Sequence, residues 1–292
     1  MKEVESLRYG VIFKKAFSEL SVFKRFVLDI IGIEIEIEKV ETEKSFAEPV
    51  GKIASRYDLF AEDVKNRIIV DIQHERHADH YHRFLHYHCA ALVEQAGNYS
   101  EYRAARTVYT IVILTSGDKH RQDVGIIDFD PKNLEGKGFG EIEHKIFYIC
   151  PKYMNEKTPE PYREWLRAIE DSLDGKVDES SYSIPEVKKI FNLIERDTVS
   201  PEERARIIEE KLKDQYIDDK FNEGRQFGIH EGILKGIAQG KVEGKVEGIA
   251  EGIEKKARET ARIMLKEGIE IKLIVKFTGL SENDILNNRH SD

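Results

Sequence analysis

The sequence predicts an α/β domain followed by a helical C-terminal region, and three observations carry this prediction. Short apolar and β-branched runs alternate with helical patterns over roughly the first 150 residues. From about residue 160 the segments become charged and amphipathic, which is typical of helices. Farther along, eight glycines recur at every fourth position from Gly224 to Gly252. We therefore expect a sheet domain with helical segments behind it.

Hydrophobic periodicity predicts the elements of the sheet domain. Apolar residues at steps of mostly three and four predict a helix or a helix pair over residues 8–31, and strict alternation predicts a strand over 33–40 with one solvated face. Residues 56–62 and 67–74 have strand character and a short connection, so they predict a hairpin. A helix of about six turns is expected over residues 76–97. Buried strands are expected at 107–115, 124–130 and 145–150.

The second half of the chain predicts three kinds of helical segment. Residues 176–222 read as an accessory helical region behind a core of residues 1–175. The glycine ladder, residues 223–253, carries the eight periodic glycines, each of which costs about 1 kcal/mol in a helix. It reads as a flexible linker, which we favour, or as a helix that packs closely on another chain and makes a homo-oligomer. Residues 254–292 have the pattern of a small helix-turn-helix. Because its final helix lacks a basic surface, a docking or capping tail is favoured over DNA reading.

Composition narrows the class of protein. The 292 residues carry a formal net charge of −9, so any site for nucleic acid must be local rather than spread over the whole surface. Residues 65–106 provide such a region, with six Lys or Arg against five acids and six histidines. No apolar run approaches the roughly 20 residues of a membrane helix, which excludes a membrane protein. The only two cysteines, Cys89 and Cys150, and an acidic N-terminus favour a cytoplasmic location.

The predicted hairpin brings two aspartates together. If the connection is symmetric about the bond between Val64 and Lys65, Asp58 lies directly opposite Asp71, where like charges are destabilising unless they are neutralised. Hard oxygen ligands of this kind suit Mg²⁺ or Mn²⁺, and Gln73 shares the face of Asp71 because side chains alternate along a strand. This arrangement favours phosphodiester cleavage. The alternative is that both aspartates are solvated and paired with nearby arginines.

The helix predicted after the hairpin carries cationic and aromatic side chains that could bind the phosphate backbone of a nucleic acid. Arg76, His80, Arg83 and Tyr87 recur at steps of four, three and four and so share one face, opposite an apolar stripe formed by Tyr81, Leu85, Cys89, Leu92 and Ala96. Such a face beside a metal site could bind phosphates, and the alternative is a solvated basic surface.

Six histidines lie between residues 74 and 88, and some pairs have the spacing of zinc ligands. A closed zinc site needs about four converging ligands, whereas these side chains point in several directions around one helix. We favour the interpretation that most of them are surface or substrate-facing residues, with zinc as the minor alternative. The six are His74, His77, His80, His82, His86 and His88.

The order of several motifs resembles one nuclease family. These motifs are FKKAF (13–17), RYDLFAED (56–63), VDIQHE (70–75), RFLHY (83–87), EQAGNY (94–99) and YTIVILT (109–115), followed by EGxxxG repeats. Over essentially the whole chain they resemble the PD-(D/E)XK nuclease family transposases, relatives of the recombination-promoting nucleases.

This resemblance implies a restriction-endonuclease-like core, a mixed sheet flanked by helices, and Mg²⁺-dependent cleavage of DNA in recombination or defence. Asp58 matches the first acid, and Asp71 and Gln73 match the (D/E)-x-Q element; the two aspartates would be the metal ligands. Arg83 and Tyr87 match the Arg-x-x-x-Tyr element, and Arg76, Arg83 and Tyr87 are the expected substrate-binding residues.

Two positions depart from the family pattern. Gly10 stands where family members commonly have an acid, three residues before the Phe-Lys pair, and Asp71 is shorter than the usual Glu. The alternative function is therefore a catalytically decayed nuclease fold that binds DNA or mediates self-assembly.

Overall fold

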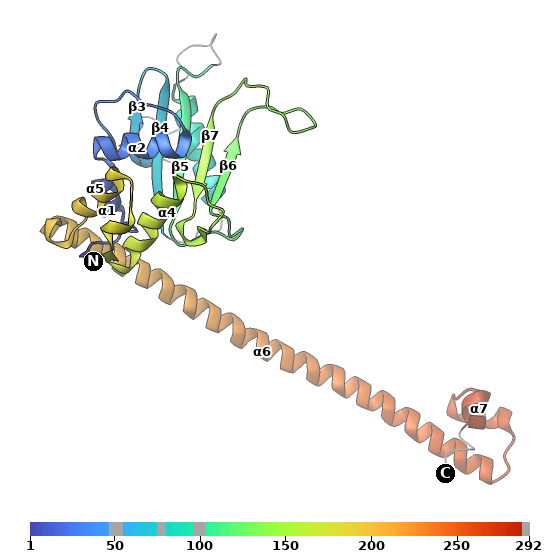
Figure 1. The fold of residues 1–292 in the computed structure, drawn as a ribbon. Coiled ribbons are helices and arrows are strands. Elements are labelled where there is room, and N and C mark those ends of the chain that lie inside the picture. Colours follow the sequence, from blue (N-terminus) through green and yellow to red (C-terminus); the bar gives the residue numbers. More distant parts are fainter. Residues whose placement is uncertain (47–54, 75–79, 96–102, 288–292) are drawn as a thin grey trace. The chain divides into compact units, whose positions relative to one another are not determined.

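The computed structural model describes residues 1–46, 55–74, 80–95 and 103–287 of the chain. These residues form two compact units, Met1–Asp214 and Gln215–Asp292. The first unit contains a mixed six-stranded sheet with helices on its faces (Figure 1). The fold class predicted from the sequence is thus confirmed.

The sheet has an antiparallel half and a parallel half. Its strand order is β2-β3-β4-β5-β7-β6, in which β2, β3 and β4 are antiparallel, β4, β5 and β7 are parallel, and β6 returns antiparallel to β7. Parallel pairing of β4 with β5 requires a crossover, which the chain makes through α3. The strands are β2 (Glu41–Ser45), β3 (Arg56–Glu62), β4 (Asn66–Gln73), β5 (Thr107–Leu114), β6 (Val124–Asp128) and β7 (Lys145–Ile149).

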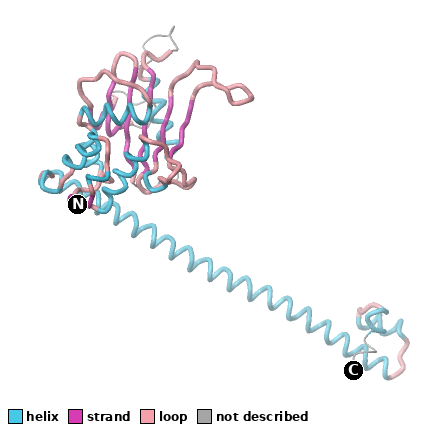
Figure 2. The backbone as a smooth tube through the Cα atoms, viewed as in Figure 1, coloured by secondary structure: helices cyan, strands magenta, loops and turns pink. Residues whose placement is uncertain are grey.

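Helices cover both faces of the sheet (Figure 2). One face packs on α1, α2, α4 and α5 through a core that includes Phe17, Val70 and Trp165, and the other packs on α3 around Ile69 and Phe84. The helices of this unit are α1 (Gly10–Phe17), α2 (Leu20–Ile31), α3 (His80–Val93), α4 (Tyr162–Asp171), α5 (Pro185–Leu193) and the first turns of α6 (Pro201–Lys266). The shorter elements are β1 (Lys2–Glu3), β8 (Lys176–Val177) and the 3₁₀ turns Pro151–Tyr153, Ser172–Asp174, Glu179–Ser181 and Arg196–Thr198.

The strand predicted over residues 33–40 is wrong, because the first strand of the sheet is β2, which begins at Glu41. Ile35 and Ile37 are buried as the alternation suggested, but their segment pairs with no strand among the residues that the structure describes. One of its N–H groups, that of Glu36, donates instead to the carboxylate of Asp63. Alternation of apolar and charged residues indicates only which side chains are buried. Here a loop that packs on the core shows the same alternation as a strand.

The predicted inward face of α3 is only partly correct, because its members Tyr81, Leu85 and Leu92 pack against the core as partly buried side chains. The helix runs from His80 to Val93, while residues 75–79 and 96–102, and with them Arg76, lie outside the described part of the chain. Cys89 of the predicted apolar stripe is exposed, and Tyr81 is partly buried. The fully buried positions are instead His80, Phe84, Tyr87, His88, Ala90 and Ala91. His88 has a partner on β5 and His80 has one in the loop after β5, so this helix turns a mixed face inward.

Residues 176–214 belong to the sheet unit rather than to a separate accessory region beginning at 176. Val187, Ile190 and Phe191 of α5 lie in the same core as α1 and α2. At the other end of the chain, β1 pairs with β8, which joins the N-terminus to residues 176–177. The boundary of the compact unit therefore falls after Asp214, within α6.

The second unit begins within α6, which continues as a helix through the whole glycine ladder. The linker favoured from the sequence is thus corrected to a helix. After α6, the helices α7 (Ile271–Thr278) and α8 (Glu282–Asn287) pack on its last turns through Ala261, Ile274 and Ile285. Among the described residues, no helix is both long and apolar enough to cross a membrane.

Candidate active site

The β3–β4 hairpin has the register predicted from the sequence. Leu59 pairs with Val70 and Phe60 with Ile69, and the N–H of Asp63 donates to the carbonyl oxygen of Asn66 at 2.9 Å. The carboxylate of Asp63 stabilises the two-residue turn by accepting from the backbone N–H of Asn66 at 2.6 Å. In this register, Asp58 and Asp71 are the pair that follows Leu59 and Val70.

The backbone ladder of the hairpin ends at Leu59 and Val70, and two carboxylates take over its hydrogen bonds. The N–H of Asp58 donates to Oδ1 of Asp71 at 3.1 Å, and the N–H of Ile72 donates to Oδ2 of Asp58 at 3.1 Å. Each aspartate thus satisfies an N–H on the opposite strand that would otherwise lack a partner. The reciprocal bonds fix both carboxylates where the strands part.

Burial makes this pair electrostatically unfavourable. Asp71 is only 4% exposed, and within the described part of the chain its Oδ2 atom has no hydrogen-bond partner. Burial, followed by the negative charge of Asp58, raises the pKa of Asp71 well above its usual range. Burial also raises the pKa of Asp58, against the opposing hydrogen bond from Ile72. Lys14 and Arg83 act in the opposite direction on both carboxyl groups, but burial and the repulsion within the pair outweigh them.

The pair fits a small hard cation. The described residues contain no group of three or more His, Cys, Asp or Glu side chains with the geometry of a metal site. Mg²⁺, however, typically uses one or two carboxylates and completes its shell with water and substrate phosphate. The unpartnered Oδ2 of Asp71 and the carboxylate of Asp58 supply that number of hard oxygen ligands.

Gln73 and Arg83 lie on the α3 side of the carboxylate pair. Gln73 is buried near the end of β4, and its Oε1 atom accepts a hydrogen bond from Nη1 of Arg83 at 3.0 Å. The guanidinium carbon of Arg83 lies 5.4 Å from the ring centroid of Tyr87, which limits its range of positions. Arg83 is otherwise exposed, so its remaining N–H groups are available to a substrate.

Tyr87 occupies a different environment from the one predicted. Its ring is buried in edge-to-face contact with Tyr57 and Phe84, and its carbonyl oxygen accepts a hydrogen bond from the hydroxyl of Tyr57. His80, on the same predicted face, lies 3.1 Å from a carboxylate oxygen of Asp118. On that face of α3, His80 and Tyr87 therefore point into the protein, whereas Arg83 is exposed.

The sequence reasoning missed two charged residues beside the pair, Lys14 of α1 and Glu43 of β2. The Nζ atom of Lys14 lies 2.7 Å from Oε1 of Glu43, and Arg56 binds the other carboxylate oxygen. Thr42 pairs with Leu59 and Lys44 with Tyr57, which places Glu43 opposite Asp58. Lys14 lies within the FKKAF motif, but only the packing of α1 on β3 shows what it approaches.

Gly10 has a carboxylate neighbour that the sequence did not indicate. Oε2 of Glu210, from the first turns of α6, accepts the N–H of Gly10 at 2.9 Å. A Cβ atom at Gly10 would lie 3.7 Å from the other oxygen of that carboxylate. Burial raises the pKa of Glu210. Glu210 of α6 thus places a carboxylate next to Gly10, the α1 position at which the family resemblance implies an acidic residue.

Three of the six histidines, His74, His80 and His88, lie against polar partners in the protein. Nδ1 of His74 lies 2.8 Å from the hydroxyl of Thr115, and Nδ1 of His88 lies 2.9 Å from the hydroxyl of Thr110. His82 is exposed on α3, and His77 lies outside the described residues. His80 and His88 are thus exceptions to the expectation that most of these rings face solvent or substrate.

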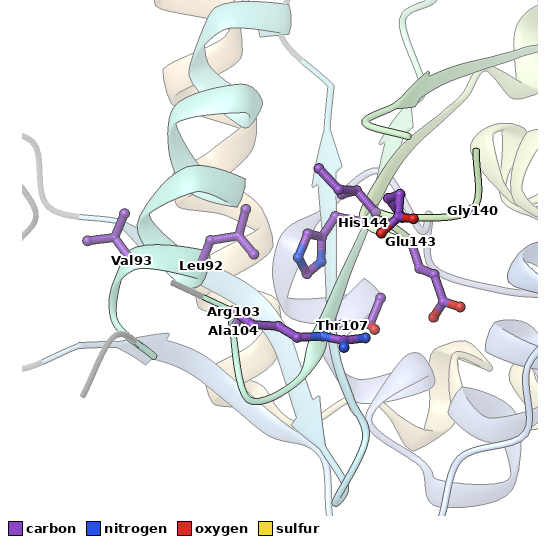
Figure 3. Close-up of a pocket in the computed structure, with 10 residues that line it drawn as sticks. Leu92, Val93, Arg103, Ala104, Thr107, Gly140, Glu143 and His144 are labelled. Carbon is purple, nitrogen blue, oxygen red and sulfur yellow. The ribbon is translucent and has the colours of Figure 1, made fainter. Parts of the chain in front are cut away.

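A separate cavity of about 410 Å³ has a different set of lining residues, which Figure 3 shows. Its walls come from the end of α3 at Leu92 and Val93, from the segment that leads into β5, and from residues 140–144 before β7. His144 lines it, and its Nδ1 atom accepts the N–H of Val108 at 2.9 Å. The cavity contains neither Asp58 nor Asp71, so the chemistry of the carboxylate pair is not located there.

Comparisons with protein families match both units of the chain. Residues 254–290 match the Rpn/YhgA-like nuclease family, C-terminal HTH domain. This match supports DNA as a partner, where the sequence favoured a docking tail. No curated protein matches the sequence. Residues 13–222 match the PD-(D/E)XK nuclease family transposase. Since this match spans well over half of the chain and includes the hairpin with its two aspartates, the protein belongs to the PD-(D/E)XK nuclease family transposases.

Proposed function

We propose that the protein is a Mg²⁺- or Mn²⁺-dependent endonuclease that hydrolyses phosphodiester bonds in DNA, in recombination or in defence. The observation that carries the proposal is the Asp58–Asp71 pair, in which Oδ2 of the buried Asp71 has no hydrogen-bond partner among the described residues. Family membership supports a nuclease role. We place the activity in the cytoplasm, where a reducing environment keeps Cys89 and Cys150 as free thiols.

In this proposal each side chain has a defined task. Asp58 and Asp71 hold the cation, which when bound lowers the pKa of a water molecule and stabilises negative charge on the phosphate. Gln73 orients the attacking water or the phosphate through its amide group, and Arg83 fixes that amide from α3. The exposed N–H groups of Arg83 bind the phosphate backbone next to the site. We propose the same backbone contact for Arg76, whereas Tyr87 contributes by positioning Arg83 through its ring.

Plasmid nicking tests the proposed activity. The full chain should nick supercoiled DNA with Mg²⁺ or Mn²⁺, and EDTA should abolish the reaction. Asp71→Asn keeps the shape of the side chain but removes its charge, so the rate should fall by about 100-fold or more. The same substitution should abolish binding of Mn²⁺ in calorimetry.

Asp219→Asn is a matched control because it makes the same change at an exposed site on α6. It should leave both readings at the wild-type level. Full nicking activity in Asp71→Asn, or no cleavage of any DNA by the wild-type protein, would contradict the proposal. The second result, with DNA binding retained, would instead favour a decayed nuclease fold that acts as a DNA-binding protein.

We propose in addition that the glycine ladder of α6 associates with a second copy of the chain. Eight helical glycines cost on the order of 8 kcal/mol, while the ion pair between Lys235 and Glu231 is worth only tenths of a kcal/mol. Along the ladder, large apolar side chains are each more than half exposed. They are Phe227, Ile229, Ile233, Leu234, Ile237, Val242, Val246, Ile249 and Ile253. Burial of these side chains in a pair of helices would offset the glycines. The oligomeric state of the full chain and of ladder variants tests this.

A further inference from the structure

Lys14 binds Glu43, the residue of β2 that lies opposite Asp58, from the helical layer on the other side of the sheet from Arg83. It lies on α1, which packs on β3, and its side chain is largely buried, with its Nζ atom 2.7 Å from Glu43. Burial raises the pKa of Asp58 and of Asp71, and the positive charge of Lys14 acts in the opposite direction on both. Arg83 acts on both aspartates in the same way from α3. The two aspartates are thus flanked by one cation from each helical layer.

Glu43 holds Lys14 with a backbone conformation that is unfavourable for its own residue type. Its φ angle is 57°, in the left-handed region that a residue with a Cβ atom seldom adopts. Thr42 and Lys44, on either side of it, keep the register with β3. Glu43 is the β2 residue opposite Asp58. Its carboxylate binds Lys14 through one oxygen and Arg56 through the other. Strain of this kind persists where the surrounding structure requires it, which is common at functional sites.

Lys14 also remains reachable from outside. Lys14, Glu43 and Arg56 line a cavity of about 400 Å³, whose other wall is formed by the first turns of α6. An anionic group of a ligand that entered this cavity would meet the ammonium group of Lys14, one residue pair away from Asp58 through Glu43. Gln73, two residues after Asp71 on β4, carries no charge, so β4 itself supplies no cation at this point.

We propose that Lys14, positioned by Glu43, contacts the phosphate of the DNA strand that is cut. The inference rests on the proposed nuclease function and adds a substrate-binding residue from α1 to the proposed site. Phosphate placed between Lys14 and the carboxylate pair would exchange the Lys14–Glu43 ion pair for a charge-assisted bond to the substrate. Negative charge that develops on the phosphate would then face a fixed ammonium group.

The test combines metal binding with cleavage, because the two should change in opposite directions. Lys14→Met removes a cation beside the aspartates, so Mn²⁺ should bind at least about threefold more tightly in calorimetry, while nicking falls about tenfold or more. Lys14→Arg retains the charge and should keep wild-type Mn²⁺ affinity. Glu43→Gln releases Lys14 toward the aspartates and should weaken Mn²⁺ binding.

Lys15→Met is the matched control. Lys15 is the next residue of α1 and is similarly buried, but its ammonium group is bound by Glu203 and by the carbonyl oxygen of Thr198. It should change neither the Mn²⁺ affinity nor the nicking rate. Wild-type cleavage in Lys14→Met, or Mn²⁺ affinity that is equal or weaker in that variant, would overturn the proposal for Lys14. Absence of Mn²⁺ binding by the wild-type protein would instead overturn the proposed function.

Discussion

Asp58 and Asp71 show how one residue pair can serve both the fold and the site. Their carboxylates complete the hydrogen bonding of two strands that have begun to separate, and the same contact brings two negative charges together in the interior. A neutral side chain at either position could accept the same N–H group without the repulsion. The charges are therefore not needed for the hairpin, which supports their assignment to cation binding.

His88 gives the fold a pH dependence at the residue scale. Burial, followed by the charge of His144, lowers the pKa of His88 to about 3, below the usual histidine value of 6.5. Between these two pH values the unfolded chain binds the proton and the folded chain does not, so stability falls as pH falls from 6.5 toward 3. This one ring should contribute a slope of up to about 1.4 kcal/mol per pH unit.

Urea unfolding between pH 4.5 and pH 7 measures that slope. His88→Gln should make the dependence on pH shallower than in the wild-type protein, whatever its effect on stability at pH 7. His82→Gln, on the exposed side of the same helix, should retain the wild-type slope. Equal slopes in the wild-type and His88→Gln proteins would show that His88 is not held neutral in the folded state.

At the scale of elements, α6 is the segment in which local preference and structure disagree. The glycine ladder favours a flexible linker by composition, yet α6 is continuous from Pro201 to Lys266. A Cβ atom at Gly240 would have no atom within 4 Å beyond its immediate surroundings in the helix. In a single chain, an alanine at this position would thus be accommodated without a clash.

Gly240→Ala therefore separates a lone helix from a closely packed pair. In a lone helix the substitution should raise stability by about 1 kcal/mol. In a pair that packs through the glycines it should weaken self-association, and Val242→Asp should do so more strongly because it places a charge among apolar side chains. Sedimentation equilibrium of the full chain measures the association. A monomer at every concentration in the wild-type protein would contradict the proposed assembly.

At the scale of the whole molecule, the chain joins a nuclease unit to a helix-turn-helix unit. The formal net charge of −9 limits non-specific attraction to DNA, so a weak contact by the nuclease site would gain from a second DNA contact in the same chain. The last turns of α6 form one cluster with α7 and α8 through Ala261, Ile274 and Ile285. A cut after residue 253 removes that cluster as a whole.

A chain that ends at residue 253 should bind a labelled DNA duplex at least about tenfold more weakly, as measured by fluorescence anisotropy at fixed salt. Its Mn²⁺ affinity should stay unchanged because Asp58 and Asp71 belong to the first unit. Wild-type DNA affinity in the shortened chain would assign the tail to protein contacts instead.

The sequence by itself determined the features that depend on near neighbours. The periodic apolar runs predicted the helix pair at the N-terminus, the buried strands β5 and β7, and the β3–β4 hairpin, whose register follows from its two-residue turn. The third expected strand, β6, forms at the edge of the sheet but is not buried. That register was enough to place Asp58 opposite Asp71, because side chains in a hairpin are ordered by counting from the turn.

Only the tertiary structure decided the features that depend on distant partners. The order of the sheet, the inward face of α3, and the approach of Lys14 and Glu43 to the aspartates all arise from packing between segments far apart in the chain. Such contacts leave no periodic signal, because burial of a polar residue is stabilised by a specific partner rather than by its own hydrophobicity. The sequence could therefore identify two acids of the candidate site, while the groups that surround them had to be read from the fold.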